Sequence, residues 1–251
     1  MGSENTTKND HAIVLKNVTR VFGSLTAVAN ISTLIEEGGI HSVIGPNGAG
    51  KTTLFNLISG SLECSAGEIF FFGQDITHAS SYIRSRIGLG RTFQITNLFQ
   101  NLTVGENVML SMAPKEFGLK SFKLAKNKST IALALLEEFG LAEQWKTAVK
   151  ELSHGEQRQV EVILGLALNS KVLLLDEPFA GLSRAETSHM MDMIYKINET
   201  VTVVLVEHDL DAVFELSDKI TVMHSGQMLS EGTRDEIRMD AKVQDAYLGS
   251  I

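Results

Sequence analysis

One glycine-rich segment constrains the fold of this chain more strongly than any other feature. Residues 45–52 read GPNGAGKT and fit the pattern G-x-x-x-x-G-K-[ST]. An apolar run at residues 40–44 precedes the segment, and residues 51–59 follow it with leucine and isoleucine side chains at helical spacing. The segment therefore predicts a strand, a glycine loop and a helix in direct succession.

This loop has the residue types that binding to a polyphosphate requires. Glycines allow successive backbone N–H groups to point at phosphate oxygens, and the N-terminus of the following helix adds partial positive charge. Lys51 supplies a mobile cation, and Thr52 carries a hydroxyl that can bind Mg²⁺. A glycine turn that merely joins a strand to a helix would not explain why Lys51 and Thr52 follow the last glycine. We therefore predict a phosphate-binding loop.

A second apolar run ends in two acidic residues of the kind that a nucleotide-hydrolysing site needs. Residues 172–175 read VLLL, and Asp176 and Glu177 follow directly. Asp176 closes the predicted strand where it can hold Mg²⁺, and Glu177 can polarise a water against the γ-phosphate. Two acids could also cap a strand end, but their occurrence together with the phosphate loop favours catalysis. The two motifs predict a Mg²⁺-dependent nucleoside triphosphatase.

The rest of the chain has the alternating pattern of an α/β protein. Strand-like runs separated by helical patterns in the C-terminal half predict parallel strands in a covered sheet. The first two strands predict an antiparallel edge, Gly226 marks a final hairpin, and helical spacing throughout residues 95–168 predicts an inserted helical subdomain. The expected strands are residues 13–18, 31–35, 40–44, 68–72, 88–93, 172–175, 201–206 and 220–223, and the expected helices are residues 51–59, 104–112, 130–139, 156–168, 184–198 and 210–216.

Composition places the chain among ordinary globular proteins. The sequence has 251 residues, 43% hydrophobic content and no apolar run of the length that a membrane span needs. With 22 basic against 30 acidic residues the net charge is −8, unlike the positive charge of most proteins that bind nucleic acid. The N-terminus lacks the apolar core of a signal peptide, and the single Cys64 cannot form an internal disulfide. We expect a cytoplasmic protein with a disordered leader at residues 1–10 and one domain at residues 11–251.

A third motif narrows the type of nucleotide-hydrolysing protein. Residues 152–156 read LSHGE at the start of a predicted helix, where Ser153 and free backbone N–H groups can form a second anion site. A serine that merely caps a helix would look the same in isolation, but this motif lies just upstream of Asp176. It resembles the signature motif LSGGQ of ATP-binding cassette (ABC) proteins. From about His11 onward the other elements of that family follow in order: Phe22 as the aromatic residue that stacks on adenine, Gln94 as the Q-loop, residues 180–183 as the D-loop and His208 as the switch histidine.

The resemblance implies the P-loop ATPase fold of ABC proteins and a site shared between two subunits. In this family two cassettes sandwich two ATP molecules, and each site pairs the phosphate loop of one subunit with the signature motif of the other. The catalytic residues that it implies are Glu177 as general base, His208 on the γ-phosphate and Gln94, and the implied Mg²⁺ ligands are Thr52, Gln94 and Asp176. The residues that it assigns to ATP are Phe22, Gly45, Asn47, Gly48, Gly50, Lys51, Thr52 and Thr53, with Ser153 and Gly155 acting across the dimer.

Two departures from the family pattern lie near these residues. His154 and Glu156 replace the usual glycine and glutamine of the signature, which changes the local charge but leaves Ser153 and Gly155 in place. We expect ATP hydrolysis to survive this change. Ser183 replaces the aspartate common at the end of the D-loop, so the sequence alone does not predict the hydrogen bond that the family makes across the dimer or the coupling between the two sites.

Further residues point to a subfamily. Residues 90–94 read GRTFQ, residues 102–108 read LTVGENV and residues 246–249 read AYLG, a set that resembles the cassettes of branched-chain amino-acid importers and their urea-type relatives. This resemblance implies a second ATPase subunit, either another copy or a paralogue, together with transmembrane permease subunits and, indirectly, a periplasmic binding protein. It also implies a peripheral position on the inner face of the plasma membrane and no nucleic-acid partner.

Several alternatives stay open at the level of the sequence. The cassette could serve urea or amide uptake or lipopolysaccharide export, because other subunits choose the transported substrate. A soluble ABC protein that acts on ribosomes or DNA is disfavoured, because such proteins usually carry two cassettes or a long coiled-coil insertion. A module that holds ATP without turnover is disfavoured by the presence of Glu177 and His208.

Overall fold

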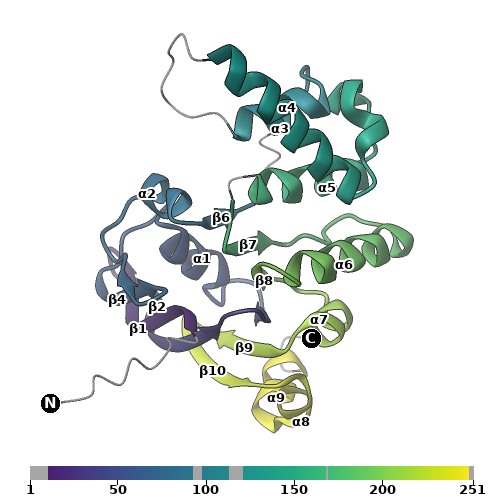
Figure 1. Ribbon diagram of the computed structural model, residues 1–251. Helices are drawn as coiled ribbons and strands as arrows, with labels where there is room; N and C mark the ends of the chain where they lie inside the picture. Colours follow the sequence, from purple (N-terminus) through teal and green to yellow (C-terminus); the bar gives the residue numbers. More distant parts are fainter. Residues whose placement is uncertain (1–10, 93–97, 113–120, 168, 249–251) are drawn as a thin grey trace, which may run out of the picture.

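The computed structural model describes residues 11–92, 98–112, 121–167 and 169–248. The predicted leader at residues 1–10 and the predicted Q-loop residue Gln94 lie outside the described residues. Strands dominate the N-terminal part of the described chain, helices the middle, and the two alternate in the C-terminal part (Figure 1).

A six-stranded, mostly parallel sheet forms the centre of the molecule. Its order is β10-β9-β3-β8-β7-β6, and all neighbouring pairs are parallel except the hairpin of β9 and β10. Strands β3, β7 and β8 are buried along their whole length, which explains their continuous apolar runs. The strands are β3 (Ile40–Ile44), β6 (Leu89–Arg91), β7 (Val172–Asp176), β8 (Thr202–Val206), β9 (Lys219–His224) and β10 (Gln227–Gly232).

A separate four-stranded antiparallel sheet covers one side of this centre. Its order is β2-β1-β4-β5, with β1 (His11–Phe22), β2 (Leu25–Glu36), β4 (Ala66–Phe71) and β5 (Gln74–Asp75). The predicted antiparallel pairing of the first two strands is confirmed. Both strands are longer than predicted, because they pair with each other beyond their apolar runs. The pairing continues past irregularities in the ladder near Asn17 and Asn30, which adopt positive φ angles of 50° and 53°.

Helices cover both faces of the central sheet and form a lobe beyond its β6 edge. Helix α1 lies between the two sheets, α6 and α7 lie on the opposite face, and α3, α4 and α5 gather at the top of the view (Figure 1). Within the described residues no helix combines the length and the apolar character that crossing a membrane requires. The helices are α1 (Lys51–Ser59), α2 (Ser81–Arg86), α3 (Val104–Ser111), α4 (Ser121–Glu138), α5 (His154–Leu166), α6 (Arg184–Asn198), α7 (Leu210–Leu216), α8 (Arg234–Met239) and α9 (Ala241–Leu248), with short 3₁₀ turns η1 (Ala142–Lys146) and η2 (Val149–Glu151).

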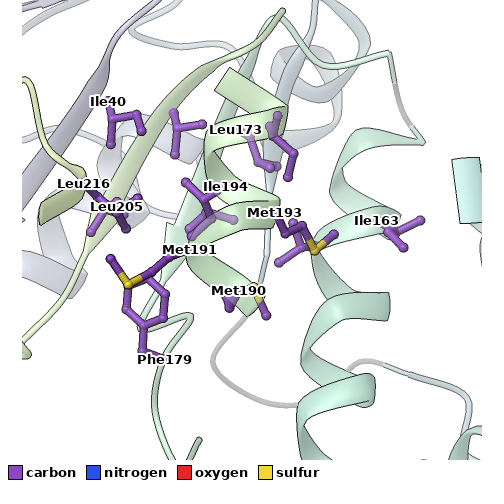
Figure 2. Close-up of a cluster of buried hydrophobic side chains, with 14 of the residues drawn as sticks. Ile40, Ile163, Leu173, Phe179, Met190, Met191, Met193, Ile194, Leu205 and Leu216 are labelled. Carbon is purple, nitrogen blue, oxygen red and sulfur yellow. The ribbon is translucent and has the colours of Figure 1, made fainter. Parts of the chain in front are cut away.

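The central sheet separates two hydrophobic cores. Alternate side chains of β7 and β8 point to opposite faces, so Leu173 belongs to the core under α5, α6 and α7, whereas Leu174 belongs to the core around α1 and the antiparallel sheet. Met190, Met191 and Met193 of α6 pack into the first core (Figure 2). The cores hold the strand ends that carry the phosphate loop, after β3, and Asp176, at the end of β7.

Candidate nucleotide-binding and hydrolysis site

The phosphate loop connects β3 to α1, and its backbone conformation requires glycine. Gly45, Gly48 and Gly50 have φ angles of 151°, 82° and 100°. A Cβ at residue 45 would lie 2.1 Å from the carbonyl oxygen of Met223, and a Cβ at residue 50 would lie 2.5 Å from that of Ala27. The loop therefore has the curled backbone, continuous with a helix N-terminus, that a phosphate site needs.

The Lys51 side chain folds back into the curve of this loop. Its Nζ donates to the carbonyl oxygens of Gly45 at 2.6 Å and Pro46 at 3.1 Å. Burial lowers the pKa of Lys51, and the negative charges of Glu177 and Asp176 oppose that shift. The structure thus holds a cation beside the loop's N–H groups and opposite two carboxylates.

A cavity of about 700 Å³ opens over the loop. It is bounded by Phe22 at the end of β1, by the phosphate loop and the first turn of α1, and by Glu177 beyond β7. Phe22 is 41% exposed, and the guanidinium of Arg20 lies 4.5 Å from its ring centroid. The predicted site residues that line the cavity are Phe22, Asn47, Gly48, Gly50, Lys51, Thr52, Thr53 and Glu177.

Asp176 ends β7 with one carboxylate oxygen held and the other unpaired. Its Oδ2 lies 3.2 Å from Nη2 of Arg91, while Oδ1 is buried without a hydrogen-bond partner among the described residues. Burial raises the pKa of the Asp176 carboxyl, and Arg91 opposes the shift. Nη1 of Arg91 donates to Oδ1 of Asn56 at 2.7 Å and to Oγ of Ser59 at 2.8 Å, so this side chain also binds α1.

These oxygens suit Mg²⁺ only if ATP contributes to the site. The unpaired Oδ1 of Asp176 is a hard oxygen ligand, and the Thr52 hydroxyl lies on the exposed first turn of α1. In the part of the chain that the structure describes, no group of three or more His, Cys, Asp or Glu side chains could hold a metal by itself. The donor set therefore fits an ion that takes most of its ligands from phosphate and water.

Glu177 and His208 follow two adjacent parallel strands. Glu177 has a φ angle of 50°, uncommon for a residue other than glycine, and its N–H donates to the carbonyl oxygen of Val206 at 2.9 Å. Nδ1 of His208 lies 3.8 Å from Oε1 of Glu177. The structure thus brings both predicted residues to the same edge of the sheet.

Sequence reasoning missed two residues at this edge. Arg91 stands in the GRTFQ segment, but its contact with Asp176 depends on the pairing of β6 with β7. Glu207 follows β8 and accepts hydrogen bonds from the backbone on both sides of the site. An acid directly after an apolar strand is the signal that found Asp176, and the same signal could have found Glu207.

The signature residues lie elsewhere in the subunit. Ser153 caps α5, and its hydroxyl accepts from the N–H of Glu156 at 3.2 Å. Gly155 is buried against α6, where a Cβ would lie 2.5 Å from Oε1 of Glu186. The Gly155 N–H hydrogen-bonds to Glu186 and, after the stronger bonds from Ser183, helps to lower the pKa of that carboxyl. Neither Ser153 nor Gly155 lines the cavity over the phosphate loop.

The two departures from the family pattern have local structural roles. His154 lies against the backbone of Gly181, where a Cβ would come within 3.2 Å of its ring. Ser183 is the N-cap of α6, and its hydroxyl donates to Oε2 of Glu186 at 2.7 Å. The signature helix and the segment after β7 are thus in direct contact within one subunit.

Comparison with known families and proteins agrees with this geometry. The family described as "ABC transporter" matches residues 28–180, and the family described as "Branched-chain amino acid ATP-binding cassette transporter" matches residues 227–250. A probable branched-chain amino acid transport ATP-binding protein, LivG, from Archaeoglobus fulgidus is 34% identical over 94% of both chains. The high-affinity branched-chain amino acid transport ATP-binding protein BraF of Pseudomonas aeruginosa is 35% identical over 94% of this chain and 96% of its own.

Solved structures share the fold over most of the chain. The ADP conformation of MJ1267, an ATP-binding cassette of an ABC transporter, superposes with a TM-score of 0.86 at 29% identity and covers 95% of this chain and 99% of its own. A dimeric structure of MJ0796, a bacterial ABC transporter cassette, gives a TM-score of 0.76 at 27% identity, over 88% and 98% of the two chains. The chain therefore belongs to the ABC transporter family and is one of its ATP-binding and ATP-hydrolysing cassettes.

Proposed function

We propose that the chain energises the import of branched-chain amino acids. One observation carries the proposal: relatives named for branched-chain amino acid transport are 34–36% identical over 91–94% of this chain. The separate match at residues 227–250, to a family of the same description, supports it from a part of the chain outside the general ABC match. The substrate class is thus inferred from likeness over the whole length, not from a pocket for an amino acid.

The cavity supports a specific way of holding ATP. Adenine stacks on the exposed face of Phe22, and the triphosphate runs along the phosphate loop toward Glu177. The ammonium of Lys51 exchanges its two carbonyl partners for phosphate oxygens, and the negative charge of those oxygens stabilises the buried cation. Asn47, Gly48, Gly50 and Thr53 form the wall around the phosphates, the last through the first turn of α1, and Gly45 supplies the turn at which the loop begins.

The strand ends support direct attack of water on the γ-phosphate. The water oxygen attacks the γ-phosphorus while the carboxylate of Glu177 accepts a proton from that water. The bond from the γ-phosphorus to the β–γ bridging oxygen breaks, and ADP leaves with that oxygen. His208, within 3.8 Å of Glu177, donates a hydrogen bond to the γ-phosphate and holds it in line. The positive φ of Glu177 aims its side chain into the cavity that the phosphate loop forms.

Thr52 and Asp176 are the residues that would hold Mg²⁺, with Gln94 proposed as a further ligand. When bound, the ion would neutralise negative charge on the phosphates. The free Oδ1 of Asp176 supports this assignment, since a buried carboxylate oxygen without a partner is costly unless a cation or water fills the site. Arg91 holds the other oxygen and leaves Oδ1 for the ion.

The separation of the signature from the cavity supports a site completed by a second subunit. Ser153 and Gly155 of one cassette then face the γ-phosphate that the other cassette holds. The Gly155 N–H then donates to the γ-phosphate instead of to Glu186. ATP bound by two subunits favours the closed pair, and hydrolysis removes that preference. The helical subdomain transmits the change to permease subunits on the cytoplasmic face of the membrane, with a periplasmic binding protein supplying the amino acid.

Uptake measurements test this function. Deletion of the gene from its organism should abolish high-affinity uptake of radiolabelled leucine, isoleucine and valine, and the wild-type gene should restore it. Lys51→Ala should fail to restore uptake, because the γ-phosphate loses its mobile cation. Normal leucine, isoleucine and valine uptake in the deletion strain, with loss of urea or amide uptake instead, would contradict the proposal.

A further inference from the structure

A fully buried carboxylate lies at the end of β8, beside the hydrolysis site. Glu207 follows five buried residues of that strand, and its side chain is 0% exposed. Within the described chain Nδ1 of the His208 imidazole lies 3.7 Å from its Oε2, and no Lys or Arg nitrogen there approaches it as closely. Burying a carboxylate without a basic partner is unfavourable unless hydrogen bonds compensate, so the surroundings of Glu207 need an explanation.

Backbone N–H groups from two different loops surround this carboxylate. Oε1 accepts from the N–H of Phe179 at 2.9 Å, in the loop after β7. Oε2 accepts from the N–H of His208 at 3.0 Å and, more weakly, from that of Asp209 at 3.5 Å, in the loop after β8. Burial raises the pKa of Glu207, and these N–H groups oppose the shift. Each oxygen therefore binds one loop, and the carboxylate bridges them.

This bridge adds to a backbone contact between the same two segments. The N–H of Glu177 donates to the carbonyl oxygen of Val206, one residue before Glu207. Phe179 stands two residues after Glu177, so the two hydrogen bonds restrain the backbone at Glu177 and just after it. Nδ1 of His208 lies 3.8 Å from Oε1 of Glu177 and 3.7 Å from Oε2 of Glu207.

We propose that Glu207 is a positioning residue for ATP hydrolysis, which fixes the loops of Glu177 and His208 to each other as one unit. The proposal rests on the roles proposed above for those two residues. Glu207 is not part of the phosphate loop and does not line the cavity. It therefore acts through its hydrogen bonds to the backbone. Small displacements of reacting groups are costly, about 100-fold in rate for a shift of about 1 Å, so a rigid bridge between the loops matters for turnover.

Glu207→Gln is the sharpest variant because it keeps the size of the side chain but cannot keep both bridges. A carboxamide has one acceptor oxygen, and its NH₂ group would face a backbone N–H on the other side. Glu161→Gln is the matched control. Glu161 is also buried and burial also raises its pKa, but its partner is Arg158 on α5, at 2.8 Å, and neither residue lines the cavity.

The first measurement is steady-state hydrolysis with ADP affinity alongside. For Glu207→Gln we expect kcat to fall about 100-fold while KM and the ADP dissociation constant change less than about threefold. Glu161→Gln should retain the wild-type kcat. Wild-type turnover by folded Glu207→Gln, or equal losses in kcat and ADP affinity, would overturn the proposal.

Amide hydrogen exchange tests the bridge without relying on activity. In the wild type, the amides of Phe179 and His208 should be protected to a similar degree, because one carboxylate accepts from both. In Glu207→Gln the amide that loses its acceptor, that of Phe179 or that of His208, should exchange at least about 10-fold faster, whereas Glu161→Gln leaves both unchanged. A His208 amide that exchanges at the unprotected rate in the wild type would overturn the proposal even if the variant fails to fold.

Glu177→Gln separates failure of this inference from failure of the proposed function. If Glu177→Gln abolishes hydrolysis while Glu207→Gln leaves both turnover and exchange unchanged, the assignment of Glu177 stands and the positioning role of Glu207 is wrong. If Glu177→Gln hydrolyses ATP normally, the proposed catalytic assignment itself is wrong, and the positioning role fails with it.

Discussion

Arg91 connects the carboxylate at the end of β7 to the helix that follows the phosphate loop. Its guanidinium lies 3.2 Å from Oδ2 of Asp176 and 2.7 Å from Oδ1 of Asn56, and its side chain is 9% exposed. Only a planar group with several donors can make these contacts at once, so lysine is not equivalent here. Through Arg91, the orientation of Asp176 depends on the position of α1.

Replacing Arg91 should weaken the response to Mg²⁺ rather than binding of the nucleotide itself. In Arg91→Gln, Asp176 loses its fixed orientation, and residues that orient a metal ligand typically change metal affinity about 10-fold or more. We expect electron paramagnetic resonance of Mn²⁺ with ADP to show a correspondingly higher Mn²⁺ dissociation constant. ADP affinity measured in EDTA should stay within about threefold of wild type.

Arg84→Gln is the control for loss of a buried arginine. Arg84 is 1% exposed and donates to the carbonyl oxygens of Leu57 and Ile58, at the end of α1, without touching Asp176. This variant should lower stability but leave Mn²⁺ affinity unchanged. If Arg91→Gln binds Mn²⁺ like the wild type, Arg91 does not orient the metal ligand.

Residues whose roles depend on chain neighbours could be predicted from the sequence, and those whose partners are distant could not. The phosphate loop and the two acids at the end of β7, Asp176 and Glu177, are local motifs that place their own backbone and side chains. Arg91 is 85 residues from Asp176, and Glu207 is 28 residues from Phe179. Those contacts exist only once β6, β7 and β8 are neighbours in the sheet.

At the scale of elements, a buried polar network joins the two sheets. Nε2 of His41 on β3 lies 2.8 Å from Oγ1 of Thr221 on β9, whose hydroxyl donates to Glu231 on β10. Thr33 on β2 also donates to Glu231, and Lys219 forms an ion pair with it at 2.7 Å. The network therefore fixes the antiparallel sheet to the edge of the central sheet.

His41 should make the stability of this junction sensitive to mild acid. Burial lowers the pKa of His41 from 6.5 to about 4, because desolvation outweighs the attraction of Glu231. Below pH 6.5 the unfolded chain binds a proton that the folded chain does not bind until about pH 4, so stability falls as the pH falls through this range. Over this whole range the effect lowers the free energy of unfolding by about 3 kcal/mol.

Urea unfolding from pH 7 to pH 4.5 measures this linkage. His41→Gln cannot take up a proton, so its free energy of unfolding should decline less than that of the wild type over the same range. Carboxylates contribute to both curves and cancel in the comparison. Parallel curves for the two proteins would show that His41 is not a buried neutral histidine.

Element boundaries follow the same division between local and distant causes. Helices α1, α6 and α7 have the bounds that the sequence predicts, because glycine, serine and aspartate stand at their N-caps. Helix α4 begins at Ser121, well before the predicted residue 130, in a stretch where polar side chains obscure the helical spacing. Strands β1 and β2 extend beyond their apolar runs because each has the other as a partner.

At the scale of the whole molecule, the separation of the signature residues from the cavity supports the proposal that one subunit holds two incomplete halves of a hydrolysis site. The phosphate loop and Glu177 line the cavity. Ser153 caps α5 and Gly155 lies in its first turn, and neither residue lines the cavity. Dimeric cassettes among the structural relatives, at 27% identity, support pairing of such halves between subunits. Binding of ATP and association of subunits should therefore depend on each other.

The most direct test is the mass of Glu177→Gln in solution with Mg-ATP. Light scattering after size exclusion should find a dimer with ATP and a monomer with ADP, because blocked hydrolysis preserves the γ-phosphate that both subunits bind. The wild type should hydrolyse ATP at a rate that rises more steeply than linearly with protein concentration. A Glu177→Gln monomer in saturating Mg-ATP, with wild-type hydrolysis strictly proportional to concentration, would contradict the shared site.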